Sequence, residues 1–168
     1  SILCGQSSLM RLDGWTREDI AVKPRSGMVM HWINLEPVHA WWMEKSDEEQ
    51  RKEIEKRKDQ IEVFFREAYA YYRATEAGLD TIRKDVRFES MRSVFDRTIP
   101  LIVTANSQRQ IEAAFDLADR YELRLIIYGA AQVDRMIDRF KRKRVPVILQ
   151  RVHTLPEREE DAYDRAYR

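Results

Sequence analysis

Cysteine, glycine and proline are scarce in this sequence, whose 168 residues include one cysteine, five glycines and five prolines. With Cys4 alone, neither an intramolecular disulfide nor a cysteine metal cluster can form, and the redox compartment stays open. No apolar run approaches the roughly 20 residues that span a bilayer, and no signal peptide is visible. The chain begins with Ser1 and not with methionine, so its natural start is left open and no compartment is assigned.

An excess of charge of one sign is also lacking. Lysine and arginine number 30 against 29 aspartates and glutamates, which gives a net charge of +1. This balance provides no general attraction to nucleic acid or to an anionic membrane, so neither is expected as a partner. Apolar residues make up 43% of the chain and charged residues 35%, which predicts a real core under a heavily charged surface.

Motifs of the common catalytic sites are missing too. The nucleotide-binding patterns G-x-x-x-x-G-K-[ST] and G-x-G-x-x-G do not occur, nor does the nucleophile elbow G-x-S-x-G. The three histidines, His31, His39 and His153, show neither H-x-H nor H-x-x-x-H spacing. Because a catalytic zinc usually takes three protein ligands, we expect no complete metal site and no cofactor within this chain.

Residues 1–45 predict an irregular segment of turns and short strands, because glycines and prolines interrupt short apolar pieces such as residues 28–32. All four tryptophans fall in this part of the chain. We interpret them as rings that cover a core, and an aromatic ligand-stacking site is the alternative. The four are Trp15, Trp32, Trp41 and Trp42.

A long helix is predicted over residues 46–77, followed by a shorter one over 84–97. Ser46 and Glu49 match a capping box at the start of the first helix, and Gly78 fits its end. Apolar residues recur on one face of each helix at helical intervals. They are Ile54, Ile61, Phe65, Ala68 and Tyr72 in the first helix, and Met91, Val94 and Phe95 in the second.

From residue 99 the pattern changes to alternating strands and helices. Short apolar runs rich in β-branched residues predict strands at 99–103, 123–128 and 145–149. Amphipathic helices lie between them, the first with a capping box at Ser107 and Gln110 and the second with apolar residues from 133 to 140. This order predicts a right-handed parallel βαβαβ unit with both faces of the sheet covered. The stripe of the first helix is Ile111, Ala114, Phe115 and Ala118.

Three such strands are too few to close a (β/α)8 barrel, which needs eight strands in roughly 250 residues. We therefore predict a single α/β domain over residues 1–168. It comprises an irregular segment with short strands over 1–45, a helical part over 46–98 and the βαβαβ unit over 99–168. This unit forms either an open sheet or an incomplete portion of a TIM-type barrel.

Ligands of parallel α/β folds gather at the carboxyl ends of the strands. Thr104 and Asn106 follow the first predicted strand, Tyr128 ends the second, and Gln150 follows the third. We expect these four residues to lie on one rim and to face a ligand. Ser107 is interpreted as a helix cap, because serine at a strand-to-helix junction satisfies free backbone amides.

Two stretches resemble amidohydrolase-superfamily proteins of the imidazolonepropionase-like group. Residues 5–24, with LDGWT at 12–16, are similar to a segment of the large and often exported bacterial members. Residues 100–164 are similar to two consecutive barrel strands with their intervening helix, and then a third strand with the loop after it. Together the two stretches cover about half of the chain.

The resemblance implies a metal-dependent (β/α)8 barrel that hydrolyses amide or cyclic amide bonds through metal-activated water. An intact member is expected to bind a divalent metal such as zinc. The family commonly has histidine at the places of Thr104 and Tyr128, and a hydroxyl or a phenol is a poor zinc ligand. The early H-x-H strand and the late aspartate of the family have no counterpart in this sequence, so no catalytic residue is carried over.

The function predicted in this way is a fragment of an amidohydrolase-like metal-dependent hydrolase acting on amide or cyclic amide C–N bonds, inactive as an isolated chain. Whether the chain is an enzyme stays open. One alternative is a non-catalytic module that binds a small polar molecule at the same rim. Another is a subunit that completes a barrel with the remainder of that barrel or with another copy.

Overall fold

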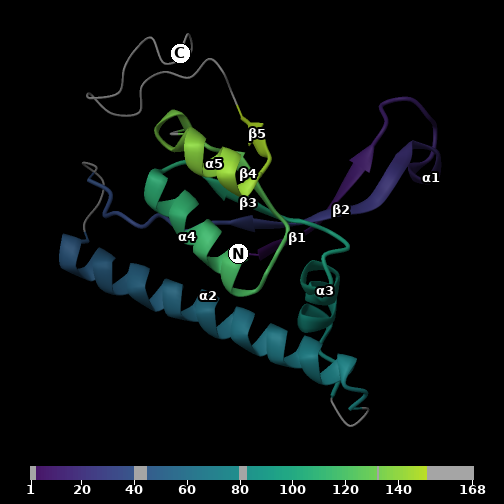
Figure 1. Cartoon of the computed structure of the whole chain (residues 1–168), viewed down its shortest axis with the longest axis horizontal. Helices are drawn as coiled ribbons and strands as arrows, with labels where there is room; N and C mark the ends of the chain where they lie inside the picture. Colours follow the sequence, from purple (N-terminus) through teal and green to yellow (C-terminus); the bar gives the residue numbers. More distant parts are fainter. Residues whose placement is uncertain (1–2, 40–44, 80–82, 132, 151–168) are drawn as a thin grey trace.

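The computed structural model describes residues 3–39, 45–79, 83–131 and 133–150, and it contains one five-stranded sheet in the order β1-β2-β3-β4-β5 (Figure 1). Strand β1 is antiparallel to β2, and β2 to β5 all run parallel. The parallel order predicted for the last three strands is therefore confirmed, and β2 extends it by one strand. The strands are β1 (Leu3–Met10), β2 (Ala21–His31), β3 (Leu101–Ala105), β4 (Leu125–Gly129) and β5 (Val147–Leu149).

The N-terminal part holds more regular structure than predicted, with strands of 8 and 11 residues in place of short ones. The two strands form a ribbon that projects from the body of the molecule, with helix α1 (Arg17–Ile20) at its tip (Figure 1). Thr16 caps this helix by accepting a hydrogen bond from the Asp19 amide at 3.2 Å. The outer part of the ribbon is exposed on both sides. It therefore lacks the alternation of apolar and polar residues by which a half-buried strand is recognised.

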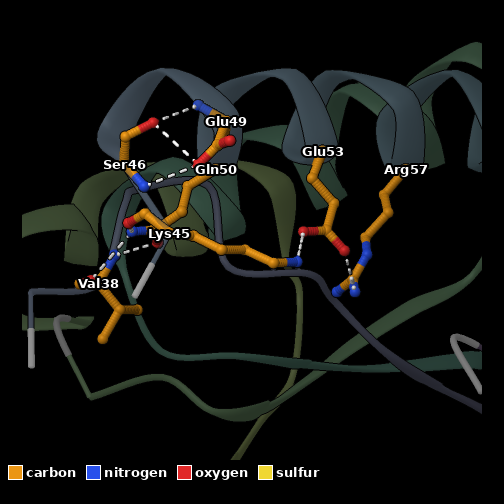
Figure 2. Close-up of polar contacts among 7 residues, drawn as sticks. All are labelled: Val38, Lys45, Ser46, Glu49, Gln50, Glu53 and Arg57. Atoms are coloured by element: carbon orange, nitrogen blue, oxygen red, sulfur yellow. Dashed lines mark hydrogen bonds and ion pairs between the residues drawn. The ribbon is translucent and has the colours of Figure 1, made fainter. Parts of the chain in front are cut away.

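Helix α2 (Asp47–Glu76) matches its predicted range to within one residue at each end. Figure 2 shows its first turn, where the predicted capping box is confirmed. The Glu49 amide donates to Ser46 Oγ at 3.3 Å, and the Ser46 amide donates to Glu49 Oε2 at 3.0 Å. Gln50 ties the preceding segment to the helix, because its side chain binds both the amide and the carbonyl of Val38, at 2.9 and 3.2 Å.

Acid is expected to loosen this first turn. The hydrogen bond from the Ser46 backbone lowers the pKa of Glu49, and the hydrogen bond from Lys45 lowers the pKa of Glu53 (Figure 2). A carboxylate with a lowered pKa stabilises the fold above its unfolded pKa, and that contribution is lost as the pH falls through the folded value. We therefore expect the Cα chemical shifts of residues 46–50 to move toward coil values as the pH falls below the ordinary glutamate pKa of 4.5.

The matched control for this titration is Glu49→Gln. Glutamine can still accept the capping hydrogen bond but does not titrate in this range, so the variant should flatten the acid transition of residues 46–50. Chemical shifts that stay constant down to pH 2 in the wild-type chain would contradict the expectation.

The helices pack on one face of the sheet and enclose the core there. Along β3 and β4, buried residues alternate with half-buried ones, so helices of the described part of the chain cover one face, and not both faces as predicted. The predicted apolar stripes of helices α3 (Val86–Phe95) and α4 (Gln108–Arg120) are buried against this face. The last helical segment divides into a 3₁₀ turn, η1 (Val133–Met136), and helix α5 (Ile137–Lys143). The strand residues buried in the core are Met28, Met30, Leu101, Val103, Ala105, Leu125 and Ile127.

All three predicted strands start two residues later than predicted. For β3 and β5 the reason is the same, because they begin directly after Pro100 and Pro146, which have no amide N–H to donate to a sheet. The carbonyls of both prolines still accept from the neighbouring strand, at 2.9 Å from the Met28 amide and 3.1 Å from the Ile127 amide.

Among the described residues, none of the helices combines the length and the apolar character that a membrane-spanning helix needs.

Candidate functional site

The carboxyl ends of β2 to β5 form one rim, and a row of polar side chains lies along it. Thr104 of β3 is paired in register with Tyr128 of β4 on one side and with His31 of β2 on the other. Side chains of in-register residues on neighbouring strands point to the same face, with the strands about 4.8 Å apart. Because Val103 and Ala105 are buried under the helices, this row lies on the open face of the sheet.

Asn106 follows β3 and packs against the end of β4. Its Oδ1 occupies the place that a Cβ on Gly129 would take, so the amide lies on bare glycine backbone. Gly129 has a φ of +100°, a conformation that favours glycine. The Ala130 amide then donates to the Ala105 carbonyl at 2.8 Å, which holds the two strand ends together.

Gln110 fixes the turn between β3 and α4. Its Oε1 accepts from the amides of Asn106 and Ser107, both at 3.0 Å, and its Nε2 donates to the Ile33 carbonyl at 3.0 Å. The side chain therefore ties the end of β2 to the end of β3. Ser107 accepts from the Gln110 amide at 3.3 Å, which confirms its interpretation as a helix cap.

The structure brings together three of the four predicted site residues. Thr104 and Tyr128 are direct register partners, and Asn106 contacts the residue after Tyr128. Gln150 lies directly after β5, where it is exposed and at the opposite end of the rim from β2. His153 lies outside the described residues.

His31 belongs to the row, and sequence reasoning did not select it. Residues 1–45 were predicted to be irregular, so the end of β2 was not recognised as a strand end. The signal was present, because residues 28–30 are an apolar run that ends in a polar residue, as β3 does at Thr104. The side chain of His31 is exposed, whereas Thr104 and Tyr128 are half-buried.

An imidazole, a hydroxyl and a phenol can together donate and accept hydrogen bonds to a small polar molecule. As a metal-binding set they are weak, because only the imidazole is a good zinc ligand. Within residues 3–39, 45–79, 83–131 and 133–150, no group of three or more His, Cys, Asp or Glu side chains could hold a metal ion. The described rim thus offers hydrogen bonding in place of metal ligation.

The fold and the rim define an α/β protein with a mostly parallel sheet whose strand ends form the candidate site. No family model and no curated protein matches the sequence. Among solved structures, the chain is similar to the crystal structure of an amidohydrolase from Thermotoga maritima MSB8, with a TM-score of 0.72 over 95% of this chain. The chain spans 42% of the length of that structure, at 17% identity. This likeness shows an amidohydrolase-like fold and no more.

Proposed function

We propose that this chain is a segment of an amidohydrolase-like (β/α)8 barrel of the imidazolonepropionase-like group, whose members hydrolyse amide or cyclic amide C–N bonds. The observation that carries the proposal is the in-register row of His31, Thr104 and Tyr128 on the open face, at the carboxyl ends of parallel strands. In a closed barrel that face is the interior, and that rim is where the active site is built.

A second row on the same face supports a barrel. Val29, Ile102 and Ile126 are paired in register two residues before the polar row, and all three are half-buried with no helix of the described ranges over them. Bulky apolar side chains on the inner face of parallel strands are typical of a barrel interior. The proposed partner is therefore the remainder of the barrel, which would cover these side chains.

The row does not fit a catalytic zinc, since it supplies one imidazole where three protein ligands are usual. We propose that this part of the rim has lost its metal ligands or that they come from other strands of the barrel. The described residues then bind and orient a substrate by hydrogen bonds, and the isolated chain has no hydrolytic activity.

Restoring two imidazoles tests this proposal. Thr104→His/Tyr128→His places three imidazoles on adjacent strands of one face, together with His31. We expect the double variant to bind zinc at least about 100-fold more tightly than the native chain, because ligand number dominates zinc affinity. The measurement is a zinc titration of the purified chain against a chromophoric chelator, with circular dichroism to show that the fold is kept.

The matched control is His31→Ala in the double variant, which should remove most of the gained affinity. A double variant without added zinc affinity would contradict descent from a metal site. If the double variant gained no zinc affinity and the native chain nevertheless bound hydantoin, a cyclic amide, without turning it over, the second candidate would be favoured. That candidate is a non-catalytic module for a small polar molecule, and the hydrogen-bonding character of the row supports it.

A further inference from the structure

The row on the open face continues onto β5, where its chemistry changes. Tyr128 of β4 is paired in register with Ile148 of β5, and Val147 before it packs against the core. Since successive residues of a strand point to opposite faces, the side chain of Ile148 lies on the open face beside Tyr128. The described residues leave it 45% exposed. The row therefore passes from hydrogen-bonding side chains on β2, β3 and β4 to an apolar side chain on β5.

Of the tryptophans that the structure describes, neither supplies a ring to this row. Trp15 is 101% exposed at the tip of the ribbon, so the prediction that it covers a core was wrong. The eleven residues of β2 separate it from His31, which at about 3.3 Å per residue is roughly 35 Å. Trp32 packs against the core, as predicted, and Trp41 and Trp42 lie outside the described residues. Ile148 is therefore the apolar side chain that the described row presents.

The extended row contains no carboxylate, ammonium or guanidinium group. Its members are His31, Thr104, Tyr128 and Ile148. An amide is uncharged and both donates and accepts hydrogen bonds, as the hydroxyl of Thr104 and the phenol of Tyr128 also do. Neighbouring strands are about 4.8 Å apart, so a short branched alkyl group on such an amide spans the step from Tyr128 to Ile148. A charged group in the same place would lose hydration without gaining a partner from isoleucine.

We propose that this rim binds an uncharged amide that carries an apolar substituent, with the amide across Thr104 and Tyr128 and the substituent against Ile148. Hydrogen bonds hold the amide, and burial of the substituent selects among amides, which makes Ile148 a specificity-determining residue. This selectivity rests on the proposed function, in which the polar row binds a ligand, and it adds the chemical class of that ligand.

Three hydantoins that differ at carbon 5 test the selectivity in titrations of the whole chain followed by NMR chemical shifts. One is unsubstituted, one carries an isobutyl group and one carries a carboxymethyl group. We expect isobutylhydantoin to bind about tenfold more tightly than hydantoin, as burial of roughly two methylene groups does. Carboxymethylhydantoin should bind no more tightly than hydantoin. The methyl resonances of Ile148 should shift with the isobutyl compound.

Two neighbouring residues of β5 provide a matched pair of variants. Ile148→Ser should reduce the preference for isobutylhydantoin to about twofold or less and leave the affinity for hydantoin unchanged, because it removes the apolar contact alone. Leu149→Ser is the control: Leu149 is 61% exposed and paired with Gly129, so its side chain points to the opposite face. It should keep the full preference. Thr104→Val should weaken both ligands equally, because it removes a hydrogen-bonding group and no apolar contact.

Each other outcome overturns the proposal in a recognisable way. Equal affinity for hydantoin and isobutylhydantoin, with shifts at Thr104 and Tyr128, would remove the role of Ile148 and leave the proposed function intact. A preference that is lost in Leu149→Ser and kept in Ile148→Ser would place the substituent on the other face. If neither compound shifted the resonances of the row, the row would not be an amide site, and its ligand role in the proposed function would fail as well. The zinc titration, which needs no organic ligand, would still test descent from a metal site.

Discussion

Replacing Phe65 with alanine is expected to lower the free energy of unfolding by about 3–5 kcal/mol. Phe65 is 1% exposed and lies at the centre of the packing of α2. Its ring contacts Phe64 edge-on, with centroids 5.9 Å apart, and Tyr121 after α4 at 5.8 Å. Truncation removes the ring that joins these two helices and leaves a cavity that the neighbouring strands cannot fill.

The matched control is Val63→Ala, two residues earlier on the same helix. Val63 is 38% exposed, so its truncation should cost less than about 1 kcal/mol. Urea denaturation measures the free energy of unfolding of both variants. The slope of that free energy against urea concentration should match the slope of the wild type. Similar losses at positions 63 and 65 would show that α2 does not present this face to the sheet, and the packing described for the core would be wrong.

The same helix shows where prediction from sequence stops. Spacing alone placed Ile61, Phe65 and Ala68 on the buried face, and the structure confirms all three. Tyr72, the next predicted member, is half-buried and packs against the core, but Tyr71 beside it is buried more deeply and was not predicted. Spacing could not select Tyr71, because steps of three and four residues fit a helix equally well. A tertiary contact holds it in place: the Tyr71 hydroxyl donates to Glu89 Oε2 of α3 at 2.9 Å.

The candidate site could also be predicted only in part, because spacing along the sequence does not show which elements become neighbours. Strand ends are visible in the sequence, so Thr104 and Tyr128 could be placed on one rim and the structure pairs them. The contribution of His31 depends on which strand lies beside β3, and sequence spacing contains no information on that neighbour. Because Ile102 and Ile126 are apolar, the sequence predicted that both faces of the sheet are covered. The described helices cover only one face. The barrel interior that we propose for the other face would account for both observations.

Gly129→Ala is expected to lower the free energy of unfolding by about 3 kcal/mol, by combining backbone strain with crowding. At a φ of +100° an alanine is strained wherever it stands, and its Cβ would fall on Asn106 Oδ1. The side chain of Asn106 must then leave the end of β4, and the rim loses the contact that joins it to β3. Adding Asn106→Ala to Gly129→Ala should restore the part of the loss that comes from crowding.

Gly78→Ala separates the two causes, because Gly78 has a φ of +73° and a Cβ there would meet nothing within 4 Å. Strain alone should then cost about 1 kcal/mol at the end of α2. Thermal or urea denaturation of the three variants gives the difference between the two glycines, and chemical shifts of Thr104 and Tyr128 report whether the polar row moves. A loss at Gly129 no larger than that at Gly78, with those shifts unchanged, would mean that Asn106 does not rest on the end of β4. The rim would then be open at that point, and Asn106 would have to be removed from the candidate site.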